Sequence, residues 1–289
     1  MATKPTIPYY APAELLPAPL PTKAEILASK KRLSAPHETD VFRVGEHYAV
    51  KYGRRVNLQE GENMLFVRQS TSIPIPNVYA LFTDEATKWS FIVMEYIPGR
   101  NLEYTWDKLS PAEKTAIVSQ LRQHMDELRS VPSPGHYGGI WGQPIQDFLF
   151  QRDPGAPPSA EAEISGPHKT EEQWVNGMMR CLQVGTESIG EREMVFGRRH
   201  CHAVFKGHKA VFTHANLVRR NVILRGDGTV VIIDWENAGW YPSFWEYCFS
   251  ALMLNHRDDW DESLYAILDT YAAELGWMGY YRDLLRHRA

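Results

Sequence analysis

Apolar and polar residues alternate along parts of the first hundred positions in the way that is typical of β-strands. Residues 41–51 alternate with a period of two and predict a β-hairpin, and residues 78–82 and 89–96 predict two further strands. Residues 58–70 instead carry apolar positions at helical spacing, which predicts a helix between the hairpin and the later strands. The dipeptide Pro98-Gly99 predicts the end of this mostly β region.

The pattern becomes helical after residue 110. Ser110-Pro-Ala-Glu113 is a capping box with proline at the first helical position, so it predicts the start of a helix. Apolar residues then follow at a spacing of four and define one buried helix face: Ile117, Leu121, Met125 and Leu128. A second capping box, Thr170-Glu-Glu-Gln173, predicts another helix start.

The remaining segments complete a mixed prediction. Residues 131–168 are rich in proline and glycine and predict a long loop or insertion. Short apolar runs predict strands at 211–213, 222–224 and 230–233, the last two joined through Asp227-Gly228. We expect helices in the rest of the chain, and therefore an α+β fold.

Residues 1–22 contain six prolines, which block helix formation and remove backbone donors. We expect this segment to be an extended arm that packs on the body of the protein, because it carries Tyr9, Tyr10, Leu15 and Leu16. It has no uninterrupted apolar core, so it is not expected to be a signal peptide.

Composition and charge narrow the possible classes of protein. The chain has 289 residues with 44% hydrophobic content, which suits one large domain or two lobes. The net charge is −4 and no basic block is present, so we expect neither nucleic acid nor a membrane as a partner. Three cysteines without metal-ligand spacing indicate a reducing, cytoplasmic setting. The oligomeric state stays open.

The candidate chemistry lies in two segments near the end of the chain, from His214 to Asn221 and from Asp234 to Glu236. In the kinase template an aspartate accepts the proton of the substrate hydroxyl, an asparagine five residues later binds Mg²⁺, and a later aspartate binds Mg²⁺ at the phosphates. Asn221 and Asp234 occupy the two metal positions here. Asn216 stands at the position of the base, and an amide cannot accept a proton at neutral pH as a carboxylate does.

These segments resemble the aminoglycoside phosphotransferase / choline kinase-like family, especially its fungal members. The resemblance runs from about residue 41 to about residue 247. The family reads His-Gly-Asp-Leu-x-x-x-Asn and then Ile-Asp-Trp-Glu, and this chain departs from it at Ala215 and Asn216. The resemblance implies a protein-kinase-like fold, with a β-rich N-lobe at 23–97 and a helical C-lobe at 98–289. It also implies ATP and Mg²⁺ as cofactors, a small-molecule substrate and a degenerate catalytic motif.

The same resemblance suggests roles for residues in the N-lobe. Lys51 would meet the α- and β-phosphates and pair with Glu60 on the next helix, in preference to Glu62. Met94, Glu95 and Tyr96 have the position of the hinge that binds adenine, although an ordinary strand end is a nearly equal alternative for any one of these side chains. The segment 34–39 would have to cover the phosphates without the usual glycines.

Further candidates surround the catalytic segment. His214 is expected to brace the loop, and Ala215 would restrict it if the backbone needs a positive φ there. Arg219 or Arg220 could approach the transferred phosphate, although a carboxylate-paired or solvated arginine is an equal alternative. Four residues are candidates for the substrate site: Trp235, Glu236, Trp240 and Trp245. Core packing is the alternative for the aromatic members.

Three hypotheses of function follow. The first is an ATP- and Mg²⁺-dependent small-molecule phosphotransferase that is impaired or atypical because Asn216 replaces the base. The second is a pseudokinase that binds a nucleotide or partner without transfer. The third is a kinase fold reused for another reaction of secondary metabolism, such as a cyclisation or isomerisation. Fold alone does not decide between them.

Overall fold

The computed structural model describes residues 2–35, 39–150, 159–185, 189–254, 256 and 258–286. These residues form two compact units. The first comprises residues 1–105 and 219–236, and the second comprises residues 106–218 and 237–289. Each unit is described by itself.

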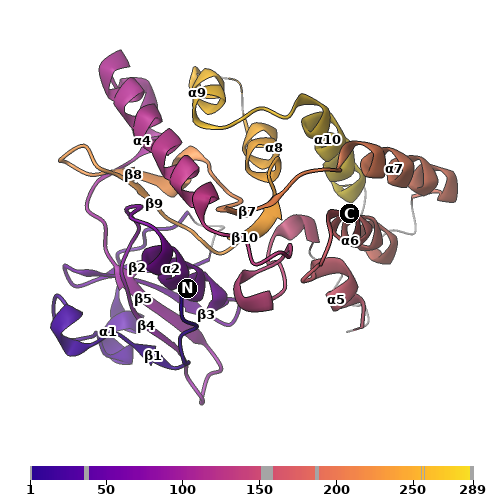
Figure 1. The fold of residues 1–289 in the computed structure, drawn as a ribbon. Coiled ribbons are helices and arrows are strands. Elements are labelled where there is room, and N and C mark those ends of the chain that lie inside the picture. The colour runs from indigo at the N-terminus through magenta and orange to yellow at the C-terminus, as the bar shows by residue number, and fades with distance from the viewer. Residues whose placement is uncertain are drawn as a thin grey trace. The chain divides into compact units, whose positions relative to one another are not determined.

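The first unit is built on a five-stranded sheet with the order β1-β4-β5-β3-β2 (Figure 1). All four pairings are antiparallel. The strands are β1 (Tyr9–Tyr10), β2 (Val41–Val44), β3 (Tyr48–Gly53), β4 (Val78–Thr83) and β5 (Ser90–Glu95). The predicted hairpin and the two predicted strands are confirmed, within one or two residues at their ends.

The N-terminal arm covers one face of this sheet. Side chains that alternate along β3 and β5 form a buried cluster on that face, and four arm residues pack against it: Ala11, Leu16, Ala18 and Leu20. The Tyr48 hydroxyl donates a hydrogen bond to the Ala18 carbonyl, and β1 pairs with the edge of β4. The arm therefore packs on the body as predicted, although Tyr10 and Leu15 stay largely exposed.

Other segments complete the edges and the second face of the sheet. At the opposite edge, Arg32 forms a β-bridge with Phe42 of β2. The helix α1 (Lys23–Ala28) follows the arm and starts at a capping box made by Thr22 and Glu25. The helix α2 (Gln59–Ser70) packs closely on β4, because a Cβ at Gly61 would lie 2.1 Å from Leu81 Cδ2.

A small second sheet brings a distant part of the chain into the first unit. Its order is β6 (Arg100–Asn101), β8 (Val222–Leu224) and β9 (Val230–Ile232). The β8–β9 hairpin turns through Asp227-Gly228, as predicted, and Gly228 has a φ of 86° that suits glycine. The helix α3 (Leu102–Thr105) follows β6, and a 3₁₀ turn, η5 (Arg219–Asn221), precedes β8.

The second unit is mainly helical. Its helices are α4 (Pro111–Ser130), α5 (Ser159–Ser165), α6 (Glu171–Gly185), α7 (Glu191–Val204), α8 (Trp245–Leu252), α9 (Trp260–Ile267) and α10 (Ala272–Arg286). Ser110 and Glu113 form the predicted capping box of α4, and the predicted apolar face of this helix is buried. At α6 the box is partial, because Gln173 bonds the Lys169 amide instead of the Thr170 amide. A two-stranded sheet joins β7 (Ala210–Thr213) to β10 (Gly239–Pro242).

Two elements differ from the sequence-based prediction. The strand β10 was not predicted, since Gly-Trp-Tyr-Pro lies within an aromatic run that has no alternating pattern. The helix α5 lies inside residues 131–168, which were predicted to be a loop. Short 3₁₀ turns occur elsewhere: η1 (Ala13–Leu15), η2 (Trp106–Lys108), η3 (Ile140–Gly142) and η4 (Phe148–Phe150).

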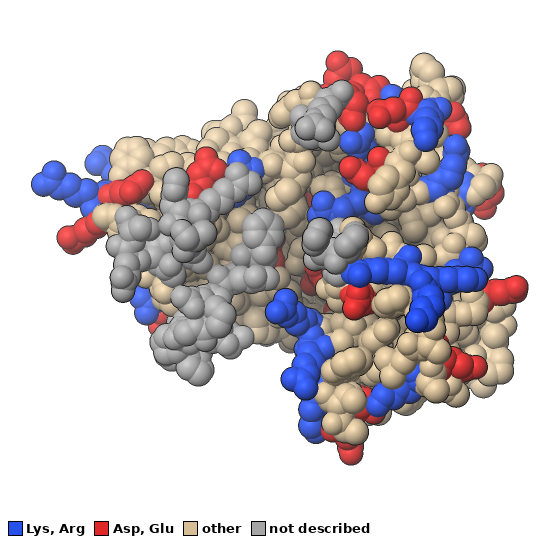
Figure 2. All heavy atoms as spheres, turned by 180° about the vertical axis from the view of Figure 1, so that it is seen from behind, with Lys and Arg blue, Asp and Glu red and all other residues tan. Residues whose placement is uncertain are grey.

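The distribution of surface charge and the apolar character of the helices are two further features of the described residues. Acidic and basic side chains are interspersed over the face shown in Figure 2. Among the helices that the structure describes, none combines the length and apolar character required to cross a bilayer.

Candidate functional site

Lys51 is the centre of a charged cluster within the first unit. Its Nζ lies 2.7 Å from Glu60 Oε2, 2.8 Å from Glu236 Oε2 and 3.3 Å from Asp234 Oδ1. The lysine is only 5% exposed, so it is not the ordinary surface lysine that a strand end often carries. The structure thus brings together one ammonium and three carboxylates from three separate segments of the sequence.

Local structure explains why these side chains meet. Tyr48 and Val50 belong to the buried cluster under the arm, so alternation along β3 directs Lys51 to the other face of the sheet. Glu60 lies in the first turn of α2, which packs on that sheet. Asp234 lies two residues after the end of β9 and has a φ of 67°, a left-handed conformation that aspartate tolerates better than most residues.

Asn221 and Asp234 are held at the same end of one hairpin. Val222 of β8 pairs with Ile232 of β9, and the Ile233 amide donates to the Asn221 carbonyl over 2.9 Å. The register of the single antiparallel pair β8–β9 therefore determines how the two predicted metal residues lie relative to each other. Asn221 is buried.

The cluster carries more negative than positive charge. Burial alone would lower the pKa of Lys51, but Glu60, Asp234 and Glu236 outweigh it and raise that pKa well above its usual value. The ammonium is therefore charged at neutral pH. Burial raises the pKa of Glu60 to about 7, Lys51 opposes this shift, and the other two carboxylates add to it. Glu60 therefore holds a proton more readily than an isolated glutamate does.

The donor set of the cluster fits a hard divalent cation. Carboxylate oxygens of Glu60, Asp234 and Glu236 lie within 4.8 Å of one another. Mg²⁺ prefers oxygen ligands and commonly takes one or two protein carboxylates together with phosphate oxygens. The side chains of Asp234 and Glu236 are 28% and 43% exposed, so both can turn toward a ligand that enters from solvent.

The segment 214–217 belongs to the second unit and is held by a buried glutamate. The amides of Ala215 and Leu217 donate to the two carboxylate oxygens of Glu246, over 2.8 and 2.9 Å. The amide of Asn216 donates to His214 Nδ1 over 3.2 Å, which gives the histidine a contact within the loop. Glu246 is 2% exposed and was not singled out from the sequence. A carboxylate inside the apolar run 244–249 was the available signal, because buried acids require partners.

Ala215 adopts the strained conformation considered from the sequence. Its φ is 63° and its side chain is fully buried. An alanine in this left-handed region costs about 1–2 kcal/mol relative to its usual conformation. The loop keeps this conformation although no glycine is present, which indicates that surrounding contacts such as those of Glu246 enforce it.

A second buried acid lies beside α8. Asp147 Oδ1 accepts the Leu149 amide over 2.8 Å, and Oδ2 accepts the indole N–H of Trp245 over 3.0 Å. Burial raises the pKa of Asp147 to about 7, the two donors oppose the shift, and the charge of Glu246 adds to it. Trp245 thus has a structural hydrogen bond in the core of the second unit.

Two other candidate substrate residues, Trp235 and Trp240, are also held by contacts within the protein. Trp235 and Trp240, like Trp245, are almost completely buried. The Trp235 indole donates to the Ile232 carbonyl, and Trp240 packs edge-on against Phe212. Their role toward a substrate stays a prediction, as does that of Glu236 beside Lys51.

The predicted hinge residues are engaged within the first unit. The Glu95 amide donates to the Asn77 carbonyl and the Tyr96 amide to the His47 carbonyl, both over 2.8 Å. The Glu95 carboxylate pairs with Arg225 over 2.7 Å. Met94 of β5 pairs with Ala49 of β3, two residues before Lys51 on the same strand.

The last site residues predicted from the sequence are Arg219, Arg220 and the segment 34–39. Arg219 is buried and lies 3.6 Å from Glu103, which corresponds to the carboxylate-paired alternative. The Arg220 carbonyl accepts from Asn101 over 2.6 Å, so its backbone is anchored to β6. In the segment 34–39, positions 36–38 lie outside the described residues.

Comparison with solved structures identifies the fold. The aminoglycoside phosphotransferase APH(4)-Ia superposes with a TM-score of 0.55 at 15% identity, over 89% of this chain and 86% of that chain. A thermostable mutant of that enzyme was solved in a ternary complex with ADP and hygromycin B. Choline kinase LicA from Streptococcus pneumoniae gives a TM-score of 0.51 at 14% identity, over 89% and 82% of the two chains. Identities this low support the fold alone.

The predicted fold class is confirmed, since a β-sheet N-terminal region and a helical C-terminal region match protein-kinase-like structures. A comparison with curated protein sequences finds no match. The family model described as the phosphotransferase enzyme family matches residues 31–282, which is most of the chain. The chain belongs to the phosphotransferase enzyme family.

Proposed function

We propose that the first unit binds ATP with Mg²⁺ and that transfer to a hydroxyl of a small molecule is impaired or atypical. The observation that carries the proposal is the buried Lys51, held at 2.7 to 3.3 Å by Glu60, Asp234 and Glu236. A permanently charged lysine next to acids that suit Mg²⁺ is the arrangement that a triphosphate requires. The similarity to enzymes solved with nucleotides supports the same ligand.

Each residue has a distinct task in this proposal. Lys51 offers a positive charge to the phosphates, and Glu60 fixes its ammonium from the buried side. Asp234 and Asn221 would hold Mg²⁺, which neutralises phosphate charge when it is bound. Glu236 is the most exposed partner of Lys51, so we expect it to give way when phosphates approach.

Asn216 limits the hydroxyl reaction. A positioned base contributes on the order of 10²–10⁴-fold to the rate of proton transfer, and an amide cannot supply it. The loop still has an ordered shape, since Glu246 holds the amides on both sides of Asn216. A carboxylate substrate would need no base. Nucleotide binding without transfer is the second candidate, and the amide at position 216 is the observation that favours it.

Calorimetry with ATP tests the proposal. We expect the parent chain to bind ATP in a Mg²⁺-dependent manner. Asp234→Asn should weaken binding at least about tenfold, because it removes a charge at the metal position. Asp227→Asn is the matched control, since Asp227 is an exposed residue in the β8–β9 turn of the same unit. Its affinity should equal that of the parent.

Two calorimetric results would contradict the proposed binding of ATP and Mg²⁺. If the parent does not bind ATP at about 1 mM, both nucleotide hypotheses fail and the reuse of the fold for another reaction gains support. If binding is unchanged in Asp234→Asn and independent of Mg²⁺, the cluster around Lys51 does not hold the metal.

A further inference from the structure

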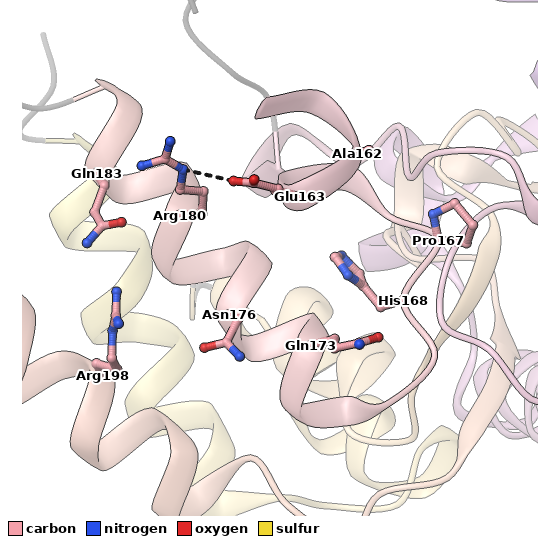
Figure 3. Close-up of a pocket in the computed structure, with 9 residues that line it drawn as sticks. All are labelled: Ala162, Glu163, Pro167, His168, Gln173, Asn176, Arg180, Gln183 and Arg198. Atoms are coloured by element: carbon pink, nitrogen blue, oxygen red, sulfur yellow. Dashed lines mark hydrogen bonds and ion pairs between the residues drawn. The ribbon is translucent and has the colours of Figure 1, made fainter. Parts of the chain in front are cut away.

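A pocket of about 460 Å³ lies in the second unit between α5, α6 and α7 (Figure 3). Its volume is in the range of sites that bind small molecules. Arg180 and Gln183 come from α6, Arg198 comes from α7, and Glu163 comes from α5. The lining is mostly polar, which sets the pocket apart from the aromatic core behind it.

The charged side chains of the pocket have an excess of positive charge. Arg180 Nε donates to Glu163 Oε2 over 3.2 Å, which uses one of the five donors of its guanidinium. Arg198 has no carboxylate partner among the residues that the structure describes. Two guanidinium groups therefore face one carboxylate.

Two of the neutral side chains, Gln173 and Asn176, add donors rather than acceptors to the pocket. The Lys169 amide donates to Gln173 Oε1 over 2.8 Å, and His202 Nε2 donates to Asn176 Oδ1 over 3.1 Å. Both carboxamide oxygens are thus already used by the protein. The NH₂ groups of these two side chains remain for a ligand.

One wall of the pocket is rigid and uncharged. The ring of His168 is buried, and its Nε2 lies 3.2 Å from the Ile164 carbonyl. Burial lowers the pKa of His168, so this ring adds no charge near neutral pH. The backbone of α6 approaches it closely, because a Cβ at Gly177 would lie 2.6 Å from the Ile164 oxygen. Trp174 packs against the same ring.

We propose that this pocket binds a small anion through a carboxylate or phosphate group. Guanidinium groups present paired N–H donors that match both oxyanions, and the two carboxamides extend the donor surface around them. A cation would instead meet two arginines, and the carboxamide oxygens of Gln173 and Asn176 already accept hydrogen bonds from the protein. The site is separate from the acidic cluster around Lys51, which lies in the first unit and has the opposite charge.

Titration with citrate and with inorganic phosphate, at matched ionic strength, tests the proposal on the full chain. We expect one of the two to bind saturably to the parent, and the tighter probe identifies the class of oxyanion. Arg198→Gln should weaken that binding at least about tenfold, because a charged hydrogen bond to the anion is lost. Arg199→Gln is the matched control. It removes the same charge from the next exposed position of α7, outside the pocket lining.

The ion pair between Arg180 and Glu163 allows a second test, in which the affinity for the anion should rise instead of fall. Glu163→Gln removes the competing carboxylate, so the anion should bind more tightly than to the parent. Both arginine variants and Glu163→Gln change exposed side chains, and thermal unfolding checks that each remains folded. The proposal is overturned if neither anion saturates below about 10 mM or if Arg199→Gln weakens binding as much as Arg198→Gln. Tighter binding of spermidine than of either anion would overturn it as well.

Discussion

Replacing Glu246 with glutamine tests how the 214–217 loop is held. In the parent the two carboxylate oxygens accept the amides of Ala215 and Leu217 over 2.8 and 2.9 Å in a buried environment. Glutamine preserves the size of the side chain but offers only one acceptor oxygen. Its NH₂ group would face the other amide, so one buried N–H would lose its partner.

The size of the effect follows from these two bonds. Hydrogen bonds to a charged group contribute about 1.5–3 kcal/mol each, and a buried donor left without a partner costs about 1–3 kcal/mol. We therefore expect Glu246→Gln to lower the free energy of unfolding of the second unit by about 3 kcal/mol. For a unit of this size, that loss lowers Tm by roughly 6–12 °C.

Urea unfolding and amide hydrogen exchange measure this prediction. The amides of residues 215 and 217 should exchange roughly 10²-fold faster in Glu246→Gln, because local opening becomes easier. Glu262→Gln is the matched control, since Glu262 is an exposed glutamate in the first turn of α9. It should stay within about 0.5 kcal/mol of the parent. If the two variants unfold at the same urea concentration and both amides keep their protection, Glu246 does not hold the loop.

Two further predictions concern the loop and the buried acid beneath α8. Ala215→Gly combined with Asn216→Asp should raise ADP release on a hydroxyl substrate by on the order of 10²-fold, measured by a coupled assay; unchanged turnover in a variant that binds Mg²⁺–ATP would remove position 216 from the chemistry. Asp147 has a pKa raised to about 7 in the folded state, so its folded form binds the proton more tightly than the unfolded form. The protonated carboxyl of Asp147 therefore stabilises the folded state at low pH, and this contribution is lost as pH rises toward 7. We expect the free energy of unfolding of the parent to fall by about 2–3 kcal/mol between pH 5 and pH 8, relative to that of Asp147→Asn. Urea unfolding at both pH values checks this, and parallel curves for the two proteins would contradict it.

Features that depend on neighbouring residues were predictable from the sequence. The capping box at Ser110 and the buried face of α4 rest on spacings of three and four residues, which local geometry determines. The hairpin at residues 41–51 rests on alternation alone. Lys51 and Glu60 were paired through the family resemblance, and the structure brings them within 2.7 Å.

Features that depend on distant contacts were not predictable in this way. Glu246 lies about thirty residues after the amides that it accepts, and no local rule relates those positions. The strand β10 forms because β7 offers it a partner, whereas its own residues have no alternating pattern. The donor-rich pocket between α5 and α7 requires three helices to meet, so single residues such as Arg198 gave no signal in the sequence.

Short segments of the chain cover the outer sides of β4 and β2 in the five-stranded sheet. The two residues of β1 pair with β4, and on the other side the Leu33 amide donates to the Val41 carbonyl over 2.8 Å beside β2. Open sheet edges allow foreign chains to add as extra strands, which is a common origin of aggregation. Edge-to-edge association through β4 or β2 therefore first requires the arm or the segment around Leu33 to detach. Aggregation would then be limited by local unfolding of these covers, and not by collisions between folded molecules.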